Sequence, residues 1–168
     1  MALLVVLGYS LTKKYTSLCH FILGIGLSLA PVGAYLAVTG TFTWLPVMFS
    51  FVVLLWSGGF DIIYALQDEG FDVRERLHSI PAWLGIRHAL SVSAFVHVIA
   101  GALLVVIGIF WDFGLWYATG TAIFLFLLTY QHLIVKSNDL SRVNAAFFTS
   151  NGIASVVFAT FTILDLFL

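Results

Sequence analysis

The sequence predicts an all-α protein, a polytopic transmembrane helical bundle, from three observations. Hydrophobic residues make up 61% of the 168 residues, and charged residues only 9%. Five stretches reach the roughly 20 apolar residues that a helix needs to cross a bilayer core of about 30 Å. Polar or charged residues separate these stretches. This composition excludes a water-soluble globular core.

The chain contains five expected spans and one shorter apolar segment. In order, the spans are Leu18–Val38, Trp44–Tyr64, Leu90–Phe110, Gly114–Val135 and Ala145–Leu164. The segment Met1–Leu7 is too short to span and lacks a basic start, so it predicts a helix stub and not a signal peptide. No repeat, linker or low-complexity run appears, and residues 1–168 are therefore expected to form a single transmembrane domain.

Every basic residue falls in an alternate connection between the spans. The basic connections are those with Lys13 and Lys14, with Arg74, Arg76 and Arg87, and with Lys136 and Arg142. By the positive-inside rule these connections are cytoplasmic. The formal net charge of −1 gives no basic surface for nucleic acid, which is excluded as a partner. The single cysteine, Cys19, provides neither an intrachain disulfide nor a zinc-type spacing.

The longest connection, Ala65–Ala89, carries seven of the 15 charged residues. If the second span continues as a helix past Tyr64, then Asp61, Tyr64, Asp68 and Asp72 share one face. The carboxylates of Asp68 and Asp72 then lie about 6 Å apart, one turn along the helix. Like charges at this spacing repel each other, and near a helix C-terminus they also oppose the dipole. We therefore expect a cation to answer them.

Two interpretations of this acidic pair remain open. It can be a solvated acidic patch balanced by arginines, or a divalent-metal site, since Mg²⁺ takes one or two carboxylates and fills its other positions with water and phosphate oxygens. Asp61 lies about 10 Å further into the membrane, where an acid is costly and indicates a functional site. The metal is assigned to Asp68 and Asp72, and Asp61 is expected to support them.

The histidines and glycines in the spans receive structural interpretations. His97 is in mid-span without an acid at helical spacing, which is typical of a hydrogen-bonded packing residue. His20, His88 and His132 lie near span ends, where interfacial solvation suffices. The paired glycines within spans predict close helix contacts, and with no preceding strand they are not phosphate loops.

Several motifs along the chain resemble those of one enzyme family. The acidic segment reads Tyr64-Ala65-x-x-Asp68-x-x-x-Asp72, with Asp61 before it and Arg74 and Ser79 after it. Further matches are Tyr9-x-x-x-Lys13-Lys14-Tyr15-Thr16, Leu23-Gly24, Ala30-Pro31-x-Gly33-Ala34, Leu77-His78-Ser79-Ile80-Pro81-Ala82, Gly85 and Asn144-x-Ala146-Phe147-Phe148-x-x-Asn151-Gly152. In this order they resemble the C-terminal portion of the UbiA-type aromatic prenyltransferases.

The resemblance implies a fold, a reaction and its partners. Such enzymes have nine helices and transfer a polyprenyl group from its diphosphate to a small aromatic acid, using Mg²⁺ held by two aspartate-rich motifs. This chain matches the later helices only, and the first motif is absent from it. The implied function is prenyl transfer to 4-hydroxybenzoate in quinone biosynthesis, with dihydroxynaphthoate as an alternative acceptor. The implied surroundings are the lipid bilayer of the inner (plasma) membrane, a cytoplasmic active-site loop and a missing N-terminal half.

The resemblance also implies roles for single residues. Asp68 and Asp72 are the expected metal ligands, supported by Asp61, while Lys13, Lys14 and Arg74 are the expected contacts of the diphosphate. Tyr64 and Gln67 are expected to orient substrate. Two positions depart from the family pattern: Lys14 stands where many members have arginine, and Arg76 stands where many have glycine.

Two other classes of protein compete with this interpretation. The chain can be a non-catalytic membrane fragment or subunit, because half of the paired metal site is missing. A small ion or solute transporter would explain Asp61 and His97 within the membrane. It would leave the clustered carboxylates and arginines of the long connection without a reason.

Overall fold

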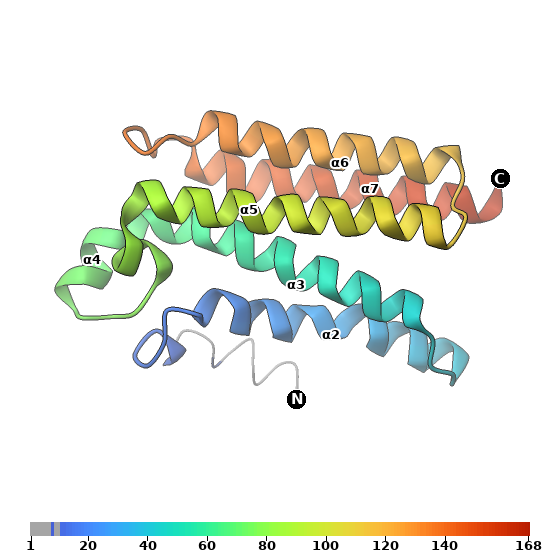
Figure 1. Ribbon diagram of the computed structural model, residues 1–168, viewed down its shortest axis with the longest axis horizontal. Helices are drawn as coiled ribbons and strands as arrows, with labels where there is room; N and C mark the ends of the chain where they lie inside the picture. Colours follow the sequence, from blue (N-terminus) through green and yellow to red (C-terminus); the bar gives the residue numbers. More distant parts are fainter. Residues whose placement is uncertain (1–7, 9–10) are drawn as a thin grey trace.

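A computed structural model describes residue 8 and residues 11–168, and within this part every long element is a helix (Figure 1). The expected stub Met1–Leu7 lies outside the described residues. The elements are α2 (Cys19–Thr39), α3 (Trp44–Ala65), the 3₁₀ turn η1 (Leu66–Asp68), α4 (Glu69–Arg74), α5 (Ile80–Phe110), α6 (Leu115–Ile134), the π-helical segment η2 (Ala145–Ser150) and α7 (Asn151–Phe167).

Five of the described helices are long and apolar enough to cross a membrane, as expected. One boundary was predicted wrongly, because α5 begins at Ile80 and not at Leu90. The Ser79 hydroxyl caps this helix by accepting from the Ala82 amide at 3.2 Å, and Pro81 lies in its first turn, both of which favour a helix start. Gly85, with φ 76°, interrupts the helical geometry and offsets the first turn from the span.

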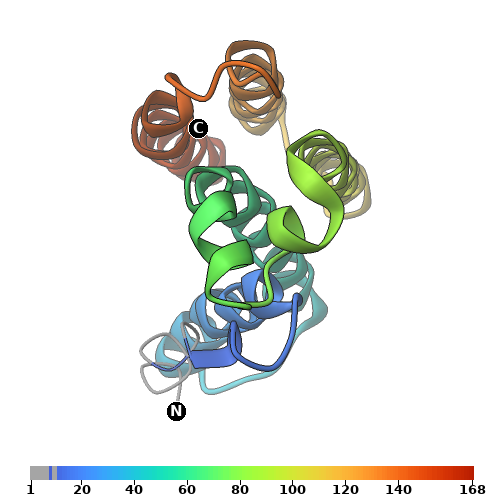
Figure 2. The same cartoon turned by 90° about the vertical axis from the view of Figure 1, so that its left-hand side faces the viewer.

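The bundle is arranged around α3, which packs against α2 on one side and α5 on the other (Figure 2). Helices α6 and α7 form the second antiparallel pair. Near the end of α7, the Asp165 carboxylate accepts from the amides of Gly114 and Tyr117, at 2.7 and 3.1 Å, and so caps the start of α6. At the other end of α7, the Asn151 amide oxygen accepts from the Trp56 indole at 3.1 Å.

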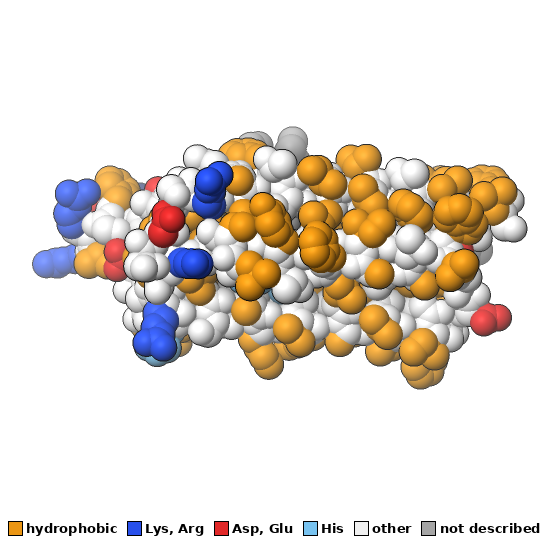
Figure 3. Space-filling view, turned by 90° about the horizontal axis from the view of Figure 1, so that it is seen from above, with side chains coloured by type: hydrophobic (Ala, Val, Ile, Leu, Met, Phe, Trp, Pro, Cys, Tyr) orange, Lys and Arg blue, Asp and Glu red, His pale blue; other side chains and the backbone are white. Residues whose placement is uncertain are grey.

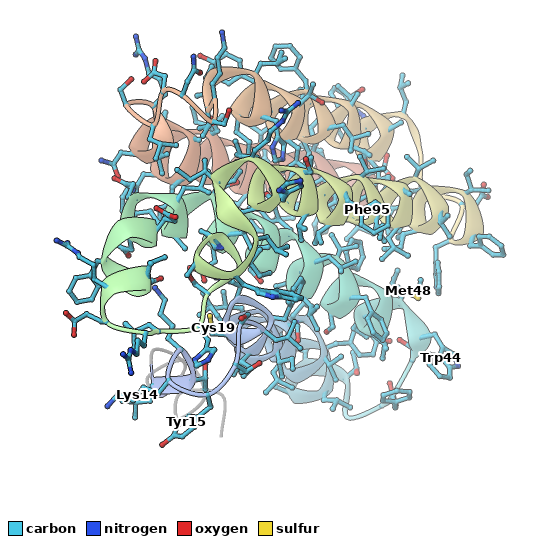
Figure 4. The ribbon with its side chains drawn as sticks, turned by 60° about the vertical axis from the view of Figure 1, so that its left-hand side comes forward. Lys14, Tyr15, Cys19, Trp44, Met48 and Phe95 are labelled. Atoms are coloured by element: carbon cyan, nitrogen blue, oxygen red, sulfur yellow. The ribbon has the colours of Figure 1, made fainter. Side chains whose placement is uncertain are left out.

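The charged connections gather at one end of the bundle. Helix α4, the segment that precedes α2 and the connection between α6 and α7 all lie at the left of Figure 1. The lysine and arginine side chains visible in Figure 3 also lie at this end, together with acidic side chains, whereas the opposite end shows acidic side chains without basic ones. In Figure 4, Lys14 and Tyr15 lie at the charged end and Trp44 at the opposite end. The basic residues therefore occupy one side of the bundle, as the alternation in the sequence predicted.

Close helix contacts hold the site end of the bundle together. A Cβ on Gly24 would lie 2.6 Å from the Leu54 carbonyl oxygen, so α2 approaches α3 here as only glycine permits. Gly59 likewise leaves room for the His97 ring of α5. A buried cluster joins the inner ends of α3, α5, α6 and η2; it comprises Ile62, Ile63, Leu66, Ile80, Ala89, Val135, Val143 and Ala146.

Candidate active site

Asp68 and Asp72 lie on consecutive turns at the end of the second span and meet the same cation. The chain passes from α3 through η1 into α4 without leaving helical geometry, which keeps both acids on one side. The Lys13 ammonium lies 3.1 Å from Asp72 Oδ2, 3.4 Å from Asp72 Oδ1 and 4.0 Å from Asp68 Oδ2. The expected cation is thus Lys13.

The two carboxylates differ sharply in exposure. The Asp72 side chain is 2% exposed, while that of Asp68 is 54% exposed. Asp72 therefore depends on Lys13 for compensation of its charge, whereas water solvates Asp68. The Lys13 ammonium thus lies between a buried and an exposed carboxylate. We expect a cation at this point to be reached from the side of Asp68, at the end of the bundle.

The turn after α4 fixes the backbone at Asp72. Arg76 has φ 53°, a left-handed conformation that favours glycine, and it follows the C-cap residue Glu75. The Arg76 amide donates to the Val73 carbonyl at 3.3 Å, and the Leu77 amide donates to the Asp72 carbonyl at 2.8 Å. These bonds form a Schellman motif, and its left-handed position explains why glycine would suit this site better than arginine.

Residues just before α2 and at its start hold the chain that leads from α4 to α5. The His78 amide donates to the Lys13 carbonyl at 2.5 Å, and the Cys19 thiol lies 3.6 Å from the His78 carbonyl oxygen. The Ile80 amide donates to His20 Nε2 at 3.3 Å. Residues 13–20 therefore supply both the ammonium between the acids and the bonds that hold the neighbouring loop.

Asp61 is paired with a histidine that the sequence interpretation placed at the interface. Asp61 Oδ2 lies 2.7 Å from His20 Nδ1, and His20 is fully buried. Because the Ile80 amide can only donate, His20 Nε2 accepts, which leaves the proton on Nδ1 to be donated to Asp61. The expectation of interfacial solvation at His20 was wrong. A buried acid needs a donor, and His20 supplies it.

The remaining predicted site residues are more dispersed. The half-buried Tyr64 ring lies 4.3 Å from the Phe147 ring, centroid to centroid, where α3 meets η2. Arg74 is exposed, and its Nε donates to the Gly70 carbonyl of its own helix at 3.1 Å. Lys14 and Gln67 are exposed at the same end of the molecule. In the described part of the chain, none of these four forms a side-chain hydrogen bond or ion pair with Asp68 or Asp72.

Mid-span His97 is held by hydrogen bonds, as expected for a packing residue. Its Nε2 donates to the Trp56 carbonyl at 3.1 Å, and its Nδ1 lies 2.9 Å from His132 Nε2. This bond to His132 was not predicted, because the two histidines lie on different helices. The pair is separate from the acids around Lys13.

The donor set at Lys13 suits a hard divalent cation. Within residues 8 and 11–168, no three His, Cys, Asp or Glu side chains group as a metal cluster. Mg²⁺ does not need three, because one or two carboxylates suffice when water and phosphate oxygens complete the octahedron. Asp68 and Asp72 both lie against the Lys13 ammonium, so this carboxylate pair could hold one divalent ion whose other positions are filled by water or phosphate oxygens.

These features define a multi-pass membrane protein with a carboxylate pair at one end of its helical bundle. Residues 1–152 match the UbiA prenyltransferase family, and the chain belongs to this family.

Known relatives agree with this assignment. The chain is 28% identical over 158 residues to a 4-hydroxybenzoate octaprenyltransferase of Nitrosomonas europaea, covering 94% of this chain and 54% of the relative. It is 29% identical over 150 residues to the enzyme of the same name from Vibrio campbellii, covering 89% and 52%. The apo structure of a UbiA homolog from Aeropyrum pernix K1 superposes with a TM-score of 0.85 at 28% identity, over 98% of this chain and 62% of that one. The chain thus spans about half the length of the curated relatives it matches.

Proposed function

We propose that this chain forms the C-terminal, metal-binding part of a polyprenyltransferase. The reaction is the Mg²⁺-dependent transfer of a polyprenyl group from its diphosphate to 4-hydroxybenzoate in quinone biosynthesis. The names of the relatives support the acceptor, and the family supports the reaction class. The observation that carries the proposal is the convergence of Asp68 and Asp72 on one cation position.

Asp68 and Asp72 would hold the ion. When bound, Mg²⁺ supplies Lewis-acid neutralisation of the diphosphate as this group leaves. Lys13 lies against both carboxylates and balances their charge, and with a divalent ion bound there its ammonium would be available to the diphosphate oxygens. Exposed Lys14 and Arg74 at the same end add positive charge for the leaving group.

An aromatic wall supports the proposed handling of the allylic cation. The rings run from Phe60 through Phe147 to Tyr64, with centroid distances of 5.3 and 4.3 Å, and Tyr64 lies one turn before Asp68. Such faces favour a cation by about 0.5–2 kcal/mol per good contact and exclude water. Tyr64 and Gln67, on the same helix as the acids, are the proposed residues that orient substrate.

The proposed location is the inner (plasma) membrane, with the active-site loop in the cytoplasm. The basic connections at the α4 end support this orientation through the positive-inside rule. The remaining part of the active site, including the first aspartate-rich motif, belongs to the proposed N-terminal half.

The test uses a chimaera in which this chain replaces the matching C-terminal part of the Nitrosomonas europaea relative. We expect Mg²⁺-dependent formation of prenylated 4-hydroxybenzoate, at least about 100-fold lower in Asp68→Asn and Asp72→Asn because the leaving-group charge is then poorly neutralised. Glu75→Gln, at an exposed acid on the same turn, is the matched control and should retain activity. Near-normal turnover of Asp72→Asn would rule out the ligand assignment.

The chain alone provides a second comparison. Expressed by itself with the same substrates, it should bind divalent ions but form no product, because the other half of the metal site is not in its sequence. Product formed by the isolated 168 residues would overturn the proposed division of the site.

A further inference from the structure

A cavity of about 230 Å³ lies between α5 and α6, away from the acids around Lys13. Its walls are mostly aliphatic, and two histidines stand in them; the lining residues are Ala94, His97, Val98, Leu125, Leu128, Thr129 and His132. Val98 is 69% exposed and Thr129 is also exposed, so the cavity opens on the outside of the bundle. In a membrane, we expect this side to face the acyl chains of lipid.

The hydrogen bonds around the two histidines can be counted in full. The Trp56 carbonyl can only accept, so His97 Nε2 carries a proton and, in the neutral ring, His97 Nδ1 is an acceptor. His97 Nδ1 accepts from His132 Nε2 at 2.9 Å, and the Gln131 side-chain nitrogen, at 3.3 Å, is a more distant donor to the same lone pair. His132 Nε2 is thereby protonated, and His132 Nδ1 is left as an acceptor.

This acceptor defines the chemistry of a ligand. No other hydrogen bond to His132 is present in the described part of the chain, so its Nδ1 lone pair suits a hydroxyl donor. No charged side chain lines the cavity, so the ligand should be uncharged. Apolar cavities of about 150 Å³ hold benzene, and the present volume therefore fits one substituted six-membered ring.

From this geometry we infer that the cavity between α5 and α6 binds a membrane-dissolved, uncharged phenol or hydroquinone, whose hydroxyl donates to His132. The ring packs on Val98, Leu125 and Leu128, and the open side admits it from lipid. This site is separate from the proposed diphosphate site, and an aromatic carboxylate would find no cation here. The inference therefore stands or falls independently of the proposed prenyl transfer.

The test is ligand binding by the purified full chain in detergent micelles, read from the histidine ring signals in ¹⁵N NMR spectra. The probes are 4-ethylphenol and its methyl ether, which has nearly the same shape but cannot donate a hydrogen bond. We expect 4-ethylphenol to shift the His132 ring signals while exposed His88 stays unchanged. The ether should bind about three- to tenfold more weakly, the worth of one hydrogen bond.

Two variants separate the hydroxyl contact from general hydrophobic binding. His132→Phe removes the acceptor but keeps a ring in the wall, and His97 keeps its bond from Gln131; it should lower affinity for the phenol to that for the ether. Val98→Phe places a larger side chain at the opening of the cavity and should weaken the binding of both probes. It gives a second test if His132→Phe does not fold. His88→Phe is the matched control and should bind the phenol as the native chain does.

The NMR shifts and the affinities of the variants together test the proposed site. Selective shifts at His132, with a preference for the phenol that disappears in His132→Phe, support it. Equal binding of the two probes, shifts spread over all histidine signals, or unchanged affinity in both cavity variants would overturn it.

Discussion

Asp61 and Asp72 are both buried acids on the same continuous helical run, yet their surroundings differ. Asp61 meets a fully buried imidazole, which is itself held by the Ile80 amide. Asp72 meets a lysine ammonium on a chain segment outside the spans, beside an open second carboxylate. The first pair is buried on both sides, whereas the second lies beside an exposed carboxylate, and we expect it to accept another cation in place of the ammonium.

From this difference we expect Asp61 to act mainly on folding and Asp72 mainly on cation binding. Removing one partner of a buried pair leaves the other partner buried without compensation of its charge. The free energy of unfolding should therefore fall. Removing the lysine from an open pair leaves a site that a soluble cation can enter, so the cost should be recovered by binding. The two acids can therefore be distinguished by which loss a metal ion repairs.

The largest effect is expected at the enclosed pair. His20→Leu should lower the free energy of unfolding by about 3–5 kcal/mol, because Asp61 is left buried without a donor. Unfolding in detergent micelles, followed by circular dichroism, measures it. His88→Leu changes an exposed histidine of α5 and should stay within about 0.5 kcal/mol of the native chain. A similarly small loss in His20→Leu, unaffected by metal, would contradict the structural role of the pair.

The open pair should show a smaller loss that metal reverses. Lys13→Met is expected to cost about 1–3 kcal/mol, since Asp72 loses its partner while Asp68 remains solvated. Millimolar Mg²⁺ should restore stability in this variant, because no ammonium competes for the carboxylates. The same titration of His20→Leu should give no recovery. If Mg²⁺ left Lys13→Met unchanged, the acids would not form a cation site.

The turn behind Asp72 provides a stabilising change. Arg76→Gly should raise the free energy of unfolding by up to about 1 kcal/mol, since a left-handed conformation costs a non-glycine residue about 1–2 kcal/mol and glycine returns part of this as chain entropy. Glu75→Gly, one residue earlier at φ −84°, should destabilise instead. Thermal unfolding of the two variants side by side measures the contrast, and equal shifts would contradict the role of the left-handed turn.

A fully exposed acid completes the series with the smallest effect. Hydrogen bonds from the Ser141 hydroxyl and the Ser141 amide hold the pKa of Asp139 below its usual value. Ser141→Ala removes the hydroxyl only, so the pKa of Asp139 should rise part of the way back toward 3.8. A pH titration of the Asp139 carboxyl carbon by NMR measures this shift, and no upward movement would contradict the bond.

Local periodicity was sufficient to predict the spans and the meeting of Asp68 with Asp72. Both depend on the helix repeat within one segment, which the sequence displays directly. The start of α5 was missed because span length was judged by apolarity. The signal at Ser79 and Pro81 was available, since serine followed by proline is typical of a helix start.

Partners on different helices were harder to predict. His20 lies 20 residues before Gly40, and Asp61 lies 21 residues after it, so an antiparallel hairpin turning at Gly40 brings them to the same depth. Counting from the turn in both directions would have suggested the pair. The same count applies to the second histidine pair, because His97 lies 17 residues before Gly114 and His132 lies 18 residues after it. It does not apply to Lys13 and Asp72, since Lys13 lies outside the spans and the bends there determine which residues it contacts.

The π-helical segment η2 (Ala145–Ser150) determines where this chain tolerates the loss of a residue. A π-turn holds one residue more than an α-turn, and such turns arise when a residue is inserted into a helix. Beyond it, Trp56 anchors α7 at Asn151 and the start of α6 anchors it at Asp165, so the extra residue cannot be absorbed by rotating α7. Deleting one residue between 145 and 150 should therefore convert the π-turn into an α-turn and leave the segments on both sides in register. Deleting one residue further along α7, where no wide turn absorbs the change, would instead rotate one part of the helix by about 100° relative to the other.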